Sequence, residues 1–278
     1  MLVHRIKISL TLLLIFFGKA GVCDVQPDFL YMDKYSLPES SEMTLLLEES
    51  AKDDPNASFK LGVHHLNRKG EGSEALKYLK RSALLGNPQA NILLGLMYYR
   101  GEGVIKDKEQ AKRYMIEASR KDRKFSHHNL GVILWHENKV KAAVSKLEIA
   151  AEEGLSISQH LLGGFYLKGE KVEKDISKSI YYLKKASDNK QSRASYLLGM
   201  IYLKEQYSNV NKKLAEKYFK TAAELGHVRG MYNLATMYFY GEGIAVNKEM
   251  AKYWYRKAAN NGHDKSREKL ANFENAVE

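Results

Sequence analysis

A leucine followed by a small residue recurs along this 278-residue chain at a nearly constant interval. The leucines of the series are Leu61, Leu94, Leu130, Leu162, Leu198, Leu234 and Leu270, so successive members lie 32 to 36 residues apart. A second series keeps almost the same interval, and its members are Ala83, Ala118, Ala150, Ala186, Ala222 and Ala258. Two series that move together along most of the chain predict one structural unit used again and again.

Each unit has the pattern of two helices. In the first helix a small residue lies four positions before the leucine and usually an aromatic residue four positions after it, as in Ala90, Leu94 and Tyr98. This spacing places the side chains on one helix face, where small residues let neighbouring helices approach and the aromatic residue is expected to fill the gap between repeats. The second helix carries an Ala-Lys-x-Tyr pattern, as from Ala111 to Tyr114. Expected caps are Asp107, Asp175 and Asn247 at N-termini and Gly154, Gly226 and Gly262 at C-termini.

Two stretches carry a family resemblance, ANILLGLMYYRGEGVIKDKEQAKRYMIEAS (90–119) and GMYNLATMYFYGEGIAVNKEMAKYWYRKAANNGH (230–263). They resemble Sel1-like repeats, which are related to the tetratricopeptide repeat. The resemblance implies an all-α, right-handed α-solenoid of about six helix-turn-helix repeats with helical caps. The repeats would occupy residues 56–88, 89–124, 125–156, 157–192, 193–228 and 229–264. Capping helices are expected at 39–55 and 265–278, with a flexible lead at 24–38.

The turn between the two helices departs from Gly-Glu-Gly in three units. The first unit has the short turn Gly70-Glu71-Gly72-Ser73, the third has His136-Glu137-Asn138-Lys139, and the fifth has Glu205-Gln206-Tyr207. We expect these departures to alter loops on one edge of the solenoid and to leave the stacking of the helices unchanged.

Residues 1–23 have the layout of a signal peptide. Arg5 and Lys7 precede an apolar run at 8–17, and small residues such as Ala20 follow. The run is too short to span a bilayer, and no later segment is apolar enough, so we expect an exported chain that is periplasmic or secreted. Cys23 is the only cysteine. Lipid anchoring there is not favoured because Val22 departs from the lipoprotein pattern, and no disulfide is expected.

The chain carries a net charge of +11. In a cytosolic protein this excess would favour nucleic acid, but behind a signal peptide it favours anionic envelope polymers, lipid headgroups or acidic proteins instead. We therefore expect a partner other than nucleic acid.

Motifs for catalysis or cofactors are weak. The turn Gly101-Glu102-Gly103 follows a helix and lacks the Lys-Ser/Thr of a phosphate loop, and no His-Glu-x-x-His metal motif occurs. Ser187 and Ser266 each begin a Ser-x-x-Lys pattern without the companion motifs of β-lactam-processing enzymes. Some cysteine-rich members of the resembled family are associated with penicillin binding and β-lactam hydrolysis, which leaves a weak cell-wall hydrolase as one alternative. The leading expectation is a non-enzymatic chain without cofactor or metal.

In tetratricopeptide-like units the first helices line a concave surface. The positions expected to face it lie at −5, −2, +2, +5 and +6 from the anchor leucine, and those at −5, −2, +5 and +6 form an aromatic and apolar floor with basic margins. The candidate groove residues are Tyr99, Arg100, His128, Trp135, His160, Lys168, Arg193, Tyr196, Lys204, Arg229, Tyr232, Phe239 and Tyr240. The apolar members are equally consistent with packing between repeats. The leading hypothesis is a monomeric adaptor that binds an acidic peptide or protein segment, and the remaining alternative is a peptidoglycan or anionic-glycan binding protein.

Overall fold

The computed structural model describes residues 40–68, 71–205, 207 and 210–274. The expected signal peptide, the flexible lead and Cys23 therefore lie outside the described residues. The described part folds into fourteen α-helices without a strand. None of these helices combines the length and apolarity needed to cross a bilayer.

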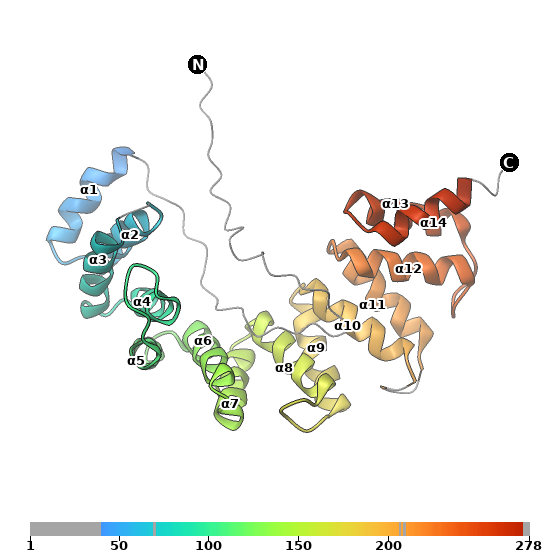
Figure 1. Cartoon of the computed structure of the whole chain (residues 1–278), viewed down its shortest axis with the longest axis horizontal. Helices are drawn as coiled ribbons and strands as arrows, with labels where there is room; N and C mark the ends of the chain where they lie inside the picture. Colours follow the sequence, from blue (N-terminus) through green and yellow to red (C-terminus); the bar gives the residue numbers. More distant parts are fainter. Residues whose placement is uncertain (1–39, 69–70, 206, 208–209, 275–278) are drawn as a thin grey trace, which may run out of the picture.

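The helices follow one another as pairs between a leading and a closing helix (Figure 1). The leading helix is α1 (Ser40–Ala51) and the closing helix is α14 (Asp264–Glu274). The first helices of the pairs are α2 (Pro55–Leu66), α4 (Pro88–Arg100), α6 (Arg123–His136), α8 (Ser156–Lys168), α10 (Ser192–Leu203) and α12 (Val228–Tyr240). The second helices are α3 (Gly72–Leu84), α5 (Lys108–Ala118), α7 (Val140–Glu152), α9 (Ile176–Asp188), α11 (Lys212–Glu224) and α13 (Lys248–Asn260).

Local sequence sets the ends of these helices as predicted. Asp107 accepts a hydrogen bond from the backbone N–H of Gln110, which satisfies one of the free donors at the start of α5. Asp175 and Asn247 cap α9 and α13 in the same way. Gly101 ends α4 in the left-handed region at φ +79°, which a residue without Cβ adopts at no steric cost. The Gly-Glu-Gly stretch is thus a turn between two helices.

The glycine after the anchor leucine brings the two helices of a repeat together. A Cβ built on Gly163 would lie 2.5 Å from Cγ of Leu183 on the second helix, so no larger residue fits without displacement. Gly62, Gly131 and Gly199 meet the equivalent side chains Leu79, Leu147 and Phe219 at 2.6 to 2.7 Å. The anchor series is therefore a contact within each repeat, made again along the solenoid.

One expectation about packing needs correction, and a second one is incomplete. The second anchor of the first repeat is Ser82, which is fully buried, whereas Ala83 is half-buried. The aromatic residue four positions after the leucine packs inside its own repeat and also contacts the preceding one, since Tyr166 and Tyr238 donate hydrogen bonds to Glu148 of α7 and Glu216 of α11. Tyr98 stacks on Tyr114 of α5 with ring centroids 5.6 Å apart, because both side chains lie where the paired helices face each other. The pairs Tyr166–Tyr182 and Tyr202–Tyr218 repeat this contact.

The helix pairs are arranged along an arc, with α4 and α6 toward its inside and α5 and α7 toward its outside (Figure 1). Each second helix contacts both its own first helix and the first helix of the next repeat. The first helices are consequently sandwiched: α8 has ten buried residues of 13, whereas its partner α9 has four. This arrangement confirms the all-α solenoid, and it leaves the second helices with the larger exposed faces.

Candidate functional site

The structure places four of the predicted groove residues in the packing between successive repeats. His128 is fully buried, and its Nδ1 lies 2.8 Å from Oγ of Ser158 on the next first helix. His160 and Tyr196 are 5% and 8% exposed. Tyr196 stacks on His227 at 4.5 Å between centroids. The −2 positions therefore do not form an open floor, because neighbouring first helices stack closely enough to cover them.

Trp135 is the fourth of these residues. It is 8% exposed and stacks flat on Phe165 of the following repeat, with ring centroids 3.6 Å apart. Lys171, from the loop after α8, donates to the carbonyl oxygen of Trp135 and holds its ammonium 5.1 Å above the indole ring. Trp135 thus joins two repeats and lies beneath a cation.

Burial also changes the charge state of the inner histidines. Desolvation, followed by the nearby guanidinium of Arg193, lowers the pKa of His160 to about 4. Desolvation and Arg193, together with Arg229, lower the pKa of His227 to about 4 as well. Both imidazoles are neutral near pH 7 and add no positive charge to a binding surface.

Several predicted residues do lie at the solvent. Arg100, Arg229 and Tyr240 are exposed, and the half-buried members are Tyr99, Lys168, Arg193, Lys204, Tyr232 and Phe239. Arg100 and Lys168 occupy the same repeat position at the end of a first helix. Each has a glutamate two residues later, with N–O distances of 3.6 Å to Glu102 and 3.7 Å to Glu170. Such exposed pairs contribute at most about 1 kcal/mol to stability.

The structure adds loop lysines that the sequence reasoning missed. Lys106 lies five residues after Gly101, with its ammonium 5.9 Å from the centroid of the Tyr99 ring. Lys174 lies five residues after the equivalent Gly169, 5.3 Å from the Tyr207 ring. Because both lysines lie five residues after a glycine that ends a first helix, this spacing could have identified them from the sequence. We name as the loop edge the residues at the ends of the first helices and in the loops after them: Tyr99, Arg100, Lys106, Lys168, Lys171, Lys174, Lys204 and Tyr240.

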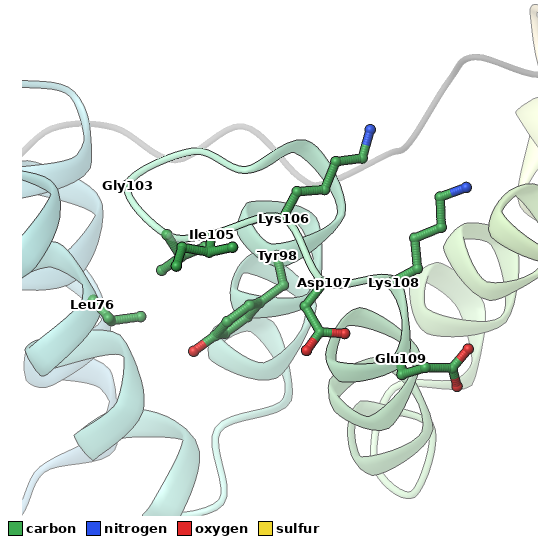
Figure 2. Close-up of a pocket in the computed structure, with 9 residues that line it drawn as sticks. Leu76, Tyr98, Gly103, Ile105, Lys106, Asp107, Lys108 and Glu109 are labelled. Carbon is green, nitrogen blue, oxygen red and sulfur yellow. The ribbon is translucent and has the colours of Figure 1, made fainter.

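A shallow hollow of about 660 Å³ interrupts the loop edge between the first two repeats (Figure 2). Its apolar wall includes Leu76 of α3, Tyr98 and Ile105, and Ile105 is 91% exposed. Figure 2 shows Lys106 and Lys108 directed outward at its rim. The hollow offers an apolar contact beside cations, which suits a side chain of a partner better than a small polar ligand.

No catalytic or metal-binding constellation emerges among the described residues. The described part holds no cluster of three His, Cys, Asp or Glu side chains able to bind a metal ion. Ser187 is buried with its Oγ 2.7 Å from Oγ of Ser195, and Ser266 is buried with its Oγ 2.9 Å from Nδ1 of His263. Both hydroxyls are engaged inside the helix packing, so the Ser-x-x-Lys patterns gain no support as nucleophiles.

A curved array of helical hairpins defines the class of α-solenoid proteins. The Sel1 repeat model matches residues 55–87, 88–122, 156–190, 192–227 and 228–263, which is well over half of the chain. The chain belongs to the Sel1 repeat family. Proteins built from Sel1 repeats generally mediate protein–protein interactions, and their scaffold is typically non-catalytic. The family model passes over 123–155, where α6 and α7 nevertheless form a helix pair.

Two solved structures support the fold. A protective antigen present in uropathogenic Escherichia coli strains aligns with a TM-score of 0.68 at 25% identity, over 83% of this chain and 51% of the other. A Sel1 repeat protein from Oxalobacter formigenes aligns with a TM-score of 0.65 at 26% identity, over 79% and 93% of the two chains.

A curated relative is the alginate biosynthesis protein AlgK of Azotobacter vinelandii, 28% identical over 156 residues. The match covers 54% of this chain and 33% of AlgK, so the chain spans about a third of the length of this relative.

Proposed function

We propose that this chain is an exported, non-catalytic adaptor that binds an acidic segment of a partner protein along the loop edge. The observation that carries the proposal is that cations occupy equivalent positions in the second, fourth and fifth repeats, whereas the third repeat has His136 there. Arg100 and Lys168 end their first helices, Lys204 follows α10 at the same repeat position, and Lys106 and Lys174 project from the intervening loops. The same loops also carry Glu102, Asp107, Glu170 and Glu173, so an anionic partner would be attracted by the individual projecting cations and not by a uniformly positive edge.

The existing ion pairs leave room for such a partner. Glu102 and Glu170 lie more than 3.5 Å from the cations of Arg100 and Lys168, at exposed positions where ion pairs are weak. Lys106 and Lys204 have no carboxylate oxygen within 4.0 Å among the described residues. A partner carboxylate would therefore gain attraction without displacing a strong internal contact.

The loop edge also contains tyrosines, which can contact the apolar side chains of a partner. Tyr99 underlies Lys106, and Tyr240, 54% exposed, receives a hydrogen bond from Lys269 at 3.3 Å. Tyrosine and arginine are enriched among the residues that dominate binding energy at protein interfaces. With the hollow beside Ile105, the edge suits a segment that alternates acidic and apolar side chains.

Export of the chain is inferred from the pattern of its N-terminal residues and from two similar proteins. A protective antigen and an alginate biosynthesis protein are the kinds of protein expected outside the cytoplasm. Residues 1–23 have the signal-peptide layout described above. Export is tested by N-terminal sequencing of the mature protein from its native host, which should reveal loss of about the first 23 residues.

Binding is tested with two synthetic peptides of equal length, one with Asp and Glu alternating with Leu and Tyr, the other with Asn and Gln at the acidic positions. The full chain should bind the acidic peptide more tightly, with an affinity that falls as salt rises. Arg100→Glu with Lys204→Glu should weaken this binding at least about tenfold, whereas the matched control Lys80→Glu with Arg113→Glu, on α3 and α5, should leave it unchanged. Equal binding of both peptides, or equal loss in both variants, would reject the proposal.

A further inference from the structure

The outer faces of α9, α11 and α13 carry a second basic surface, separate from the loop edge. Helix α9 has three basic residues and one acidic residue, α11 has four and two, and α13 has four and one. In the first three repeats the second helices are together less basic. Helix α3 has three basic residues and one acidic residue, α5 has three and two, and α7 has two and two. The positive charge of the second helices is therefore concentrated in the C-terminal half of the solenoid, where Figure 1 shows α9, α11 and α13 in succession along the arc.

Few of these cations are neutralised by the chain itself. Lys178 lies 3.9 Å from a carboxylate oxygen of Asp175. No other basic residue of α9, α11 or α13 has a carboxylate oxygen within 4.0 Å in the part that the structure describes. Glu216 of α11 accepts a hydrogen bond from the Tyr238 hydroxyl at 3.2 Å, so its carboxylate is engaged with the next first helix.

The exposed side chains form two rows because equivalent positions of a solenoid align along its length. Tyr181, Lys217 and Tyr253 are spaced 36 residues apart, and both tyrosines are exposed, at 52% and 45%. Lys184, Lys220 and Arg256 form a second, fully cationic row with the same spacing, and all three are exposed. Lys185 and Lys257 hold their ammonium groups 4.5 and 4.8 Å from the Tyr181 and Tyr253 ring centroids.

We propose that this surface, the residues of the two rows, binds a linear polysaccharide that carries carboxylates, such as a polyuronate. Sugar rings have apolar faces that can stack on the flat exposed tyrosines, while the carboxylates of successive sugars meet the lysines beside them. A linear polymer presents the same groups again and again along its length, as the two rows present aromatic and cationic side chains along the solenoid. This binding is independent of the proposed peptide binding, since it uses the second helices, whereas the loop edge lies at the ends of the first helices and in the loops after them.

The same observations argue against two other occupants. A membrane would require exposed aliphatic side chains, and the large exposed hydrophobic residues on these three helices are Tyr181 and Tyr253. Interface cores between proteins are depleted in lysine, whereas ten of the eleven basic residues here are lysines.

The test is affinity electrophoresis of the full chain in gels containing polygalacturonate, with neutral dextran of similar length as the control polymer. Polygalacturonate should retard the protein and dextran should not. Lys184→Gln, Lys220→Gln and Arg256→Gln together should weaken the affinity by about tenfold, and Tyr181→Ala with Tyr253→Ala by several-fold. The matched control Lys77→Gln, Lys80→Gln and Arg113→Gln, on α3 and α5, should change it less than about twofold.

Three outcomes would overturn the inference: no retardation by polygalacturonate, equal loss in the control variant, or tighter binding of a poly(dT) oligonucleotide than of the polyuronate. The side chains substituted in the two rows and in the control are exposed, and circular dichroism of each variant checks that the helices remain. The variant that combines Arg100→Glu with Lys204→Glu should still bind polygalacturonate. Loss of peptide binding without loss of polymer binding therefore separates the two proposals.

Discussion

Acidification should destabilise the C-terminal repeats through His160 and His227. The folded chain lowers the pKa of each from 6.5 to about 4, mainly through desolvation. Between pH 6.5 and 4 the unfolded chain therefore binds more protons than the folded chain, and stability falls as the pH falls through this window. A shift from 6.5 to about 4 corresponds, between pH 7.5 and pH 5, to a loss of about 2 kcal/mol for each histidine.

The charged neighbours reinforce this direction. Arg193 lies near both imidazoles, and His227 also has Arg229 nearby, so protonation places like charges together in a poorly hydrated region. No carboxylate is among the groups that shift the pKa of His160 or of His227. The loss is therefore not offset by a new ion pair.

The assay is urea unfolding followed by far-UV circular dichroism at pH 7.5 and pH 5, for the wild-type chain and for His160→Gln. The difference in unfolding free energy between the two pH values should shrink by about 2 kcal/mol in the variant, whatever its stability at pH 7.5. His136→Gln, at an exposed position, should retain the wild-type difference. If His160→Gln and wild type lose the same stability on acidification, the burial argument for His160 is wrong.

Three further predictions concern packing and caps. Gly163→Ala should destabilise the chain by about 1 to 3 kcal/mol, because its Cβ meets Leu183 at 2.5 Å, and a thermal melt will reveal the loss. Trp135→Ala should cost about 3 to 5 kcal/mol by removing the stack on Phe165, measured by urea unfolding, and a loss below about 1 kcal/mol would contradict the structure. Asp107→Ala should cost about 1 kcal/mol by freeing the Gln110 N–H, which faster amide exchange at the start of α5 would reveal.

The sequence predicts the helices well because their signals are local. A 36-residue period, a capping Asp107 and a left-handed Gly101 each depend on a few neighbouring residues. The stack of Tyr98 on Tyr114 was not predicted, because whether that ring meets its own second helix depends on how the two helices cross. Ser82 was missed for a related reason, since an alanine stands beside it and the shortened turn of the first repeat obscures the register.

The candidate site was less predictable than the fold. Whether a −2 residue such as His160 faces solvent depends on how closely successive first helices stack, and this distance is set by side chains about 36 residues away. The ends of the first helices are less sensitive to that stacking, and Arg100 and Lys204 therefore remain at or near the surface. The exposed charge of α9, α11 and α13 was readable in the sequence, but its significance required knowing that second helices carry the open faces.

The central claim is that an acidic protein segment binds the loop edge. Hydrogen–deuterium exchange with and without the acidic peptide tests it most directly, because protection is measured along the whole chain. The account predicts slower exchange in peptides covering 99–107, 168–175 and 203–211, with little change in α9, α11 and α13. Protection confined to those three outer helices, or no protection at saturating peptide, would contradict it.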